Sequence, residues 1–195
     1  MKTVNKRTTK YPIDDIFLKR FSPRALSGEI IYKDELMTLF EAARWAPSAS
    51  NTQPWRFIYV MRETPEFEKM ISLMIPFNKD WCIRASVLVL VVSKNLLKDG
   101  KISVSHSFDT GAAWENLALQ ASMSGFIAHG MAGFNYATAK KEFNVPEDYS
   151  VEMMIAIGKP GKVAELPEPL QSRETPSDRK PLEEMVFEGK FPNMV

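Results

Sequence analysis

Apolar residues recur along the chain with two different periods, and these predict helices alternating with strands. Between residues 33 and 45 they fall at helical spacing and form one stripe, made of Leu36, Leu39, Phe40 and Ala43. Nearly unbroken apolar runs at residues 57–61, 86–92 and 151–157 predict three buried strands, and 86–92 is expected to be covered on both faces. With 195 residues, the chain is long enough for one compact domain with a buried core.

Capping residues predict two further helices and a break. Thr64 and Pro65 suit the N-cap and the first position of a helix whose inward side carries Phe67, Met70, Ile71 and Met74. Asn135 can cap a short helix that extends to residue 143. The proline-containing segment 76–81 is expected to break the preceding helix and to form a loop.

Residues 109–124 carry apolar side chains almost all round a predicted helix. Asp109 is its expected N-cap, and Gly125 suits its C-terminal turn. A helix that is apolar all round is buried. In a chain of this size, such burial suggests a subunit interface and therefore a homodimer.

Composition excludes several classes of protein. The formal net charge of +1 shows no basic excess, so we expect no nucleic-acid partner. No apolar run reaches membrane-spanning length, and the N-terminus is polar and lacks the apolar stretch of a signal peptide, so a cytoplasmic protein is expected. Cys82 is the only cysteine, so the chain has no internal disulfide and no cysteine-based zinc cluster; we expect no metal site.

Two polar segments are candidates for ligand binding. A short helix is expected at residues 13–20, with Ile13, Ile16 and Phe17 on one side, and Arg20, Ser22 and Arg24 follow at its end. Two guanidiniums and a hydroxyl within five residues could grip a phosphate, although a solvated turn is the alternative. Residues 47–53 form a loop of small polar side chains between a helix and a strand, where backbone amides could meet a ligand; an ordinary connection is the alternative.

Two further segments suit a planar ligand. The amide of Asn78 can donate and accept hydrogen bonds, as a pyrimidine edge requires, or can serve as a turn former. Residues 125–134 carry three glycines, which let a backbone approach a ring closely, but their spacing is not a dinucleotide fingerprint. His129 could act as an acid or base, or be structural.

Several short motifs follow one another at suitable distances. They are Arg20-x-Ser22-x-Arg24, Ala46-Pro47-Ser48, Asn51-x-Gln53-Pro54-Trp55, Asn78-x-x-Trp81, Asp109-x-Gly111, His129-Gly130-Met131-x-Gly133-Phe134, Gly158-x-Pro160 and Arg179-Lys180-Pro181. The ordered set resembles the FMN-dependent nitroreductase family over nearly the whole chain. The resemblance implies an α+β fold, a three-layer α-β-α sandwich around a mixed, mostly antiparallel sheet, in an intertwined homodimer with an exchanged C-terminal arm.

The resemblance also implies a set of FMN-binding residues. They are Arg20, Phe21, Ser22, Arg24, Pro47, Ser48, Ala49, Asn51, Gln53, Asn78, Met131, Ala132, Gly133 and Arg179. Residues 47–49 are expected to approach a flavin bound mainly by the other subunit, and backbone amides at Ala132 and Gly133 to lie near the flavin N5 and O4. Phe21 stands where the family often has a polar or basic residue. Trp81 stands where some members have a lysine, so the charge that stabilises a reduced flavin is expected to come from elsewhere.

The C-terminal tail has two interpretations. After Gly161 the chain is rich in proline and charge, which is typical of disorder, yet it keeps apolar anchors at Leu182, Met185, Phe187 and Phe191. The resemblance favours one domain over residues 1–195, with 1–12 as an N-terminal arm and 162–195 as an arm that crosses the partner subunit and brings Arg179 to the FMN phosphate.

The implied activity is an FMN-dependent oxidoreductase in which NADH or NADPH delivers hydride to the flavin and leaves. A nitroaromatic, a quinone or another small electrophile then takes the electrons. No side chain is required as a catalytic nucleophile, because the flavin N5 performs the chemistry. The alternatives are a reductive dehalogenase or enal reductase on the same fold, and a flavin-binding redox protein of slow turnover.

Overall fold

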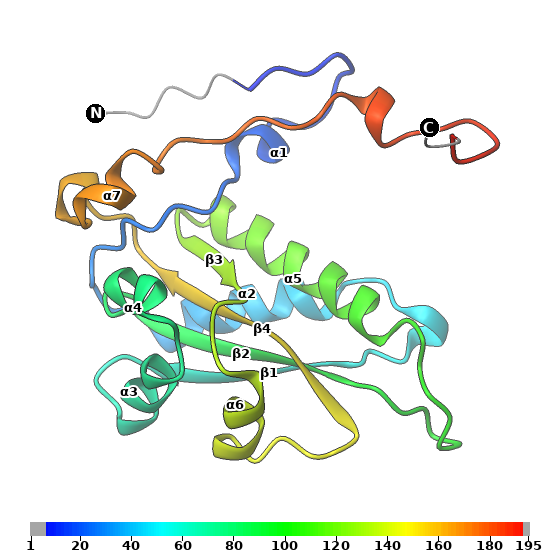
Figure 1. Ribbon diagram of the computed structural model, residues 1–195, viewed down its shortest axis with the longest axis horizontal. Helices are drawn as coiled ribbons and strands as arrows, with labels where there is room; N and C mark the ends of the chain where they lie inside the picture. Colours follow the sequence, from blue (N-terminus) through cyan, green and yellow to red (C-terminus); the bar gives the residue numbers. More distant parts are fainter. Residues whose placement is uncertain (1–6, 193–195) are drawn as a thin grey trace.

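A four-stranded antiparallel sheet forms the middle of the computed structural model, which describes residues 7–192 (Figure 1). Its strands are β1 (Trp55–Met61), β2 (Val87–Lys94), β3 (Ile127–Met131) and β4 (Tyr149–Gly158). They lie in the order β1-β2-β4-β3, and every neighbouring pair is antiparallel. Within the described residues the sheet is therefore antiparallel throughout, where the resemblance implied a mixed sheet.

Helices cover both faces of the sheet. The helices are α1 (Asp15–Lys19), α2 (Lys33–Arg44), α3 (Pro65–Ser72), α4 (Pro76–Cys82), α5 (His106–Met123), α6 (Tyr136–Glu142) and α7 (Glu168–Gln171), with short 3-10 turns η1 (Ala49–Asn51), η2 (Val163–Glu165) and η3 (Leu182–Glu184). Successive strand residues point to opposite faces. Val87, Val89 and Val91 accordingly pack with α2 and α5, whereas Leu88 and Leu90 pack with α3, α4 and α6. This confirms the α+β fold and its three layers.

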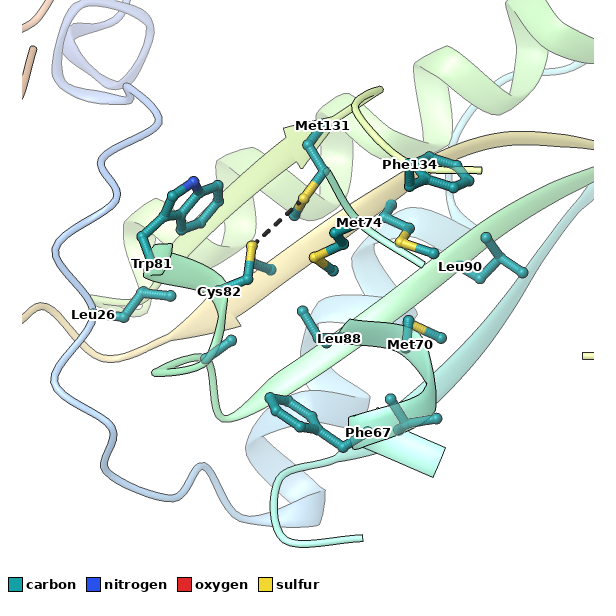
Figure 2. Packing of buried hydrophobic residues seen from close by; sticks show 14 of the residues in the cluster. Leu26, Phe67, Met70, Met74, Trp81, Cys82, Leu88, Leu90, Met131 and Phe134 are labelled. Carbon is teal, nitrogen blue, oxygen red and sulfur yellow. Dashed lines mark hydrogen bonds between the residues drawn. The ribbon is translucent and has the colours of Figure 1, made fainter. Parts of the chain in front are cut away.

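Figure 2 shows the hydrophobic cluster that contains Leu88 and Leu90. Trp81 and Cys82 of α4 pack there beside Met131 of β3, and the Cys82 Sγ lies 3.5 Å from the Met131 Sδ. Burial raises the pKa of the Cys82 thiol. The cysteine is thus a small, buried side chain of the core.

Most predicted elements are confirmed, with their caps. The Thr64 hydroxyl accepts a hydrogen bond from the Phe67 amide at the start of α3, and the Asn135 side chain accepts one from Thr138 at the start of α6. Gly125 follows α5 with a φ of 77°, in the left-handed region that favours glycine. The short helix near residues 13–20 forms as α1, although it buries none of its residues within one chain.

The predicted loop at residues 76–81 is wrong. Pro76 does not end a helix but begins α4, because proline fits the first helical turn, where its missing N–H is not needed. α3 has already ended, and Met74 forms an isolated bridge with Phe134. Asn78 is consequently a buried helical residue, not a turn former.

The start and the burial of α5 also differ from the prediction. The helix begins at His106, so Asp109 is not its N-cap; instead the Asp109 carboxylate accepts hydrogen bonds from the Ser105 hydroxyl and the Ala49 amide. Phe108 and Met123 are 83% and 62% exposed, so in a single chain the helix is not buried all round. A subunit interface along its exposed side stays a prediction.

The tail and the N-terminal segment run alongside each other over α1 (Figure 1). Leu166 and Leu170 at the beginning of the tail are buried and belong to the hydrophobic core. Further along, Lys10 forms an ion pair with Glu183, while the four predicted anchors remain exposed in one chain. Residues 1–6 of the predicted N-terminal arm and 193–195 of the C-terminal arm lie outside the described residues. Among the described helices, none is long and apolar enough to cross a membrane.

Candidate functional site

A polar cavity of about 340 Å³ brings five arginines together. It is lined by Arg7, Arg20, Phe21, Ser22, Arg24, His129, Arg173, Thr175, Ser177 and Arg179. Five of these residues come from the candidate set, although they lie on two segments about 155 residues apart in the chain. The tail therefore returns to the segment after α1 of its own chain, whereas the arm that crosses a partner subunit stays a prediction. The charged residues that line this cavity are all arginines, so its lining is strongly positive.

Arg20 and Ser22 are positioned by the end of α1. Arg20 is the C-cap of that helix in extended conformation, and its Nη1 donates to the Ser22 Oγ at 3.3 Å. Its Nε also lies 3.7 Å from a carboxylate oxygen of Glu115 on α5. These contacts keep the guanidinium at the cavity wall while leaving the Ser22 hydroxyl beside it.

Glu174 holds the Arg24 segment in place from the tail. Its carboxylate is buried and accepts hydrogen bonds from the backbone amides of Arg24, at 2.9 Å, and Ala25, at 3.2 Å. The Arg24 Nη1 lies 3.8 Å from the same carboxylate, and the Arg24 Nε is buried without a protein partner. The guanidiniums of Arg24 and Arg173 both lie over the ring of Phe77, which fixes their spacing.

Arg7 joins the N-terminal segment to this arrangement. Its guanidinium donates to the carbonyl oxygens of Arg20 and Ser177, each at 2.7 Å. Burial lowers the pKa of Arg7, and the nearby charges of Arg179 and Arg20 lower it further. This mutual repulsion among the arginines would be relieved by a bound anion.

His129 lines the arginine cavity, and the ring of Trp81 packs against it. The two rings are 4.6 Å apart, and the His129 Nδ1 donates to the Pro23 carbonyl at 3.0 Å. Burial lowers the pKa of His129 to about 4, partly offset by the hydrogen bond to Pro23. A pKa this low leaves the His129 ring neutral near pH 7, and both of its predicted roles stay predictions. The Trp81 Nε1 is buried without a protein partner, so it is a free donor.

Asn78 of α4 and Gly133, which follows β3, are in direct contact. The Asn78 Nδ2 donates to the Gly133 carbonyl at 3.0 Å. A Cβ on Gly133 would lie 2.6 Å from that nitrogen, so only glycine permits the approach. This contact joins two of the candidate segments, whose predicted contacts with FMN stay predictions. The strand β3 inside the segment is a feature that the sequence pattern does not predict.

A second cavity of about 370 Å³ begins at the end of β3. Its lining includes Met131 and Ala132 from the candidate set, together with Gly111 of the Asp-x-Gly motif and the ring of Trp114. It also includes Ser107 and Glu152, which belong to no motif. The arginine cavity and this second cavity share no lining residue, but strand β3 contributes to both, with His129 in the first and Gly130 and Met131 in the second.

The candidate loop at residues 47–53 lines neither of these two cavities. Asn51 and Gln53 instead line a third cavity of about 660 Å³ with the segment 94–99. Ser50, Asn51 and Gln53 have φ values of 50°, 54° and 47°. Residues other than glycine rarely adopt this left-handed conformation, so the backbone of the loop is strained. Within one chain, the structure does not bring this loop to the arginine cavity.

Two arginines that line the cavity, and one acidic residue that supports it from outside the lining, were not among the candidates. Arg7 and Arg173 supply charge, and Glu174 anchors the Arg24 backbone. No motif marks Arg7 or Arg173, because their role depends on how both chain ends cross α1. For Glu174 the only signal is an acidic residue in a proline-rich tail, which ordinarily is solvated.

Comparisons with known proteins agree with this architecture. A sequence model described as the Nitroreductase family matches residues 18–74. A crystal structure described as an oxidoreductase containing FMN is 41% identical, aligns over 100% of both chains, and has a TM-score of 0.93. A nitroreductase from Desulfovibrio desulfuricans in complex with FMN, described as putative, shares the fold at 24% identity and a TM-score of 0.75, over 94% of this chain and 100% of that one.

Curated relatives match shorter stretches. An oxygen-insensitive NADPH nitroreductase from Helicobacter acinonychis (strain Sheeba) is 42% identical over 60 residues, which is 31% of this chain and 28% of that enzyme. An uncharacterized protein from Mycolicibacterium smegmatis is 33% identical over 110 residues, or 56% of this chain and 74% of the relative. Together with the fold, these matches place the protein among the α+β oxidoreductases of this architecture. The chain belongs to the nitroreductase family.

Proposed function

We propose that the protein is an FMN-dependent oxidoreductase that takes electrons from NADH or NADPH and passes them to a small acceptor. The acceptors are nitroaromatics, quinones or another small electrophile. The observation that carries the proposal is the arginine cavity, which offers a phosphate site, together with the Asn78–Gly133 pair just beyond β3, the strand whose His129 lines that cavity. The similarity to an FMN-containing oxidoreductase and to an NADPH nitroreductase supports it.

The described residues fit FMN at its phosphate end. Arg20, Arg24, Arg173 and Arg179 would surround the phosphate with guanidiniums, and the Ser22 hydroxyl would add a donor. Arginine binds phosphate through two parallel hydrogen bonds, which favours this residue for the task. Arg7 would act mainly by holding the two chain segments together, because its donors already bind carbonyl oxygens.

The residues also fit the flavin ring. Asn78 would address the pyrimidine edge, and the backbone at Met131, Ala132 and Gly133 would lie along the ring. The buried donors Trp81 Nε1 and Arg24 Nε have no protein partner, so each could donate a hydrogen bond to a ligand. Trp81 carries no charge, so it would not itself supply the cation that stabilises a reduced flavin.

When bound, FMN would accept a hydride from the nicotinamide and later deliver it to the acceptor, in a ping-pong sequence. The protein's part would be to bind, orient and shield. Neutral His129 would maintain the cavity wall without moving a proton, because its pKa of about 4 keeps it unprotonated near pH 7. No side-chain nucleophile is assigned.

The protein would work as a homodimer with two flavin sites. The loop with Pro47, Ser48, Ala49, Asn51 and Gln53 lies away from the arginine cavity of its own chain, so it would contact the flavin of the partner. The exposed side of α5 and the exposed tail anchors would supply the interface, with the tail crossing the partner. Burying such apolar side chains favours association.

Steady-state NADH and NADPH oxidation tests the function directly. With FMN present, an uncharged nitroaromatic such as 4-nitrobenzamide should accelerate oxidation of the nicotinamide, and Arg24→Ala should impair it. A panel with a quinone, an enal and a halogenated phenol then ranks the acceptor classes. If FMN binds but no acceptor supports turnover, the protein is a flavin-binding redox protein and the oxidoreductase proposal is wrong.

A further inference from the structure

Four polar side chains meet at the end of the second cavity, outside every motif described above. They are Ser93 of β2, His106 and Ser107 at the start of α5, and Glu152 of β4. The His106 Nδ1 lies 2.7 Å from the Ser93 Oγ and 3.4 Å from the Glu152 Oε1. The hydroxyls of Ser93 and Ser107 both donate to that same carboxylate oxygen, the latter at 2.7 Å.

The cluster has an inner and an outer side. Glu152 and Ser107 line the cavity that also holds Met131 and Ala132, so the carboxylate faces the space beside the ring site. Ser93 is fully buried behind them, and His106 does not line the cavity. The imidazole and the carboxylate retain partial exposure, with side-chain values of 19% and 23%. A hydrogen-bonded route thus leads from His106 to the cavity through Glu152.

We propose that Glu152, supplied by His106, is the acid that protonates the electron acceptor; this rests on the proposed function. Reduction of a nitro group to a nitroso group takes one hydride and one proton: R–NO₂ + H⁻ + H⁺ gives R–NO + H₂O. The hydride adds to a nitro oxygen and brings both electrons, the proton goes to that same oxygen, its N–O bond breaks, and it leaves as water. The nicotinamide supplies the hydride by way of the flavin, and Glu152 supplies the proton.

His106 then restores the proton to Glu152. Histidine is the side chain that most readily takes up and releases a proton near neutral pH, and its Nδ1 directly faces the carboxylate and the bridging Ser93 hydroxyl. Tyr136 of α6 is the other titratable group facing Glu152: burial and then the Glu152 charge raise the pKa of Tyr136. No cationic side chain other than a protonated His106 forms an ion pair with Glu152 among the described residues.

The competing explanation is purely structural, since the cluster also ties α5 to β2 and β4. The two explanations differ in which step of the reaction they affect. If Glu152 is the acid, its loss slows reoxidation of the flavin by the acceptor and changes the pH dependence of that step. If the cluster only holds α5 against the sheet, its loss lowers the free energy of unfolding and disturbs both the reduction and the reoxidation of the flavin. A step-resolved measurement therefore distinguishes them.

The test compares Glu152→Gln, His106→Gln and the control Glu147→Gln, whose carboxylate is exposed and pairs only with Lys140. Holoprotein is reduced without oxygen, once by NADH and once by dithionite, and then mixed with 4-nitrobenzamide in a stopped-flow spectrometer. We expect unchanged reduction by NADH in all variants. Reoxidation should slow on the order of 10²-fold in Glu152→Gln, and its pH dependence should flatten, while the control matches wild type.

A second readout needs no turnover. The chain has two histidines, His106 and His129, so the ring-nitrogen NMR spectrum is simple. At a fixed neutral pH, the His106 signals should move in Glu152→Gln and stay in place in Glu147→Gln, with His129 as an internal reference. Unmoved His106 signals would mean that the pair does not exist in solution, and would overturn the proposal.

The remaining outcomes are equally decisive. Wild-type reoxidation rates and pH dependence in both Glu152→Gln and His106→Gln overturn the relay, as does a slower reaction with an unaltered pH profile. If Glu152→Gln does not fold, His106→Gln carries the same comparison. Failure of the proposed function appears separately, as a flavin that NADH cannot reduce, while the dithionite-reduced protein still reports on the proton.

Discussion

Glu174 offers a sharp test of how the tail builds the arginine cavity. Replacing it with alanine leaves the backbone amides of Arg24 and Ala25 without the acceptor that they share. An unsatisfied buried polar group costs about 1–3 kcal/mol. Because Ala25 is buried and Arg24 only partly so, we expect Glu174→Ala to lower the free energy of unfolding by about 3 kcal/mol. For a chain of this size that corresponds to a melting temperature lower by about 6–12 °C.

Thermal unfolding followed by circular dichroism measures this loss, and FMN titration measures its effect on the cavity. Freed from Glu174, the segment holding Arg20 and Arg24 should bind FMN about tenfold more weakly, equivalent to about 1.4 kcal/mol. Glu174→Gln keeps an acceptor oxygen and should fall between wild type and alanine. Glu168→Ala, an exposed change in the same tail, is the control. Equal melting temperatures and FMN affinities for Glu174→Ala and this control would refute the reasoning.

Three further predictions follow from the site. Burial holds the pKa of His129 at about 4 in the folded protein, against an ordinary value of 6.5. Between these two pH values the unfolded chain therefore binds more protons than the folded one. We expect the free energy of unfolding to keep its full value above pH 6.5 and to fall by about 3 kcal/mol as the pH drops to 4. Urea unfolding should show that this loss is smaller in His129→Gln, and an equal loss would contradict it. Arg20→Ala should weaken FMN binding more than Asn78→Ala, because a charge-assisted contact is worth about 1.5–3 kcal/mol against about 1 for a neutral one; the reverse order would misplace the phosphate. Deleting the tail from Pro167 should leave the sheet formed but lower FMN affinity and dimer stability, since Arg179 and the apolar anchors are lost; a truncated protein that stays dimeric and binds FMN equally would make the tail an appendage.

Local rules predict the elements whose signals lie within a few residues. The stripe on α2, the apolar runs of β1, β2 and β4, and the Thr64 and Asn135 caps all depend on neighbouring side chains, and the structure confirms them. Pro76 shows the limit of such rules. Proline is compatible with both the end and the beginning of a helix, and only the bridge between Met74 and Phe134 settles which applies.

The site is less predictable than the fold, because its parts meet through tertiary structure. The Arg20–Arg24 motif predicts an anion site. Arg173 and Glu174 reach that site only because the tail folds back onto the chain, which no local motif indicates. The cluster around Glu152 is invisible in the sequence for the same reason, since its members come from two strands and a helix. Asp109 has a motif position, yet its actual contact with Ala49 could be seen only in three dimensions.

The central claim is that the arginine cavity holds the phosphate of FMN, and a paired titration tests it most directly. Protein freed of flavin is titrated with FMN and with riboflavin, which has the same ring system but no phosphate, and quenching of flavin fluorescence reports binding. We expect FMN to saturate one site per chain and riboflavin to bind at least about 10²-fold more weakly, because charge-assisted contacts of about 1.5–3 kcal/mol each are missing. Equal affinity for the two flavins, or no binding of either, would contradict the account.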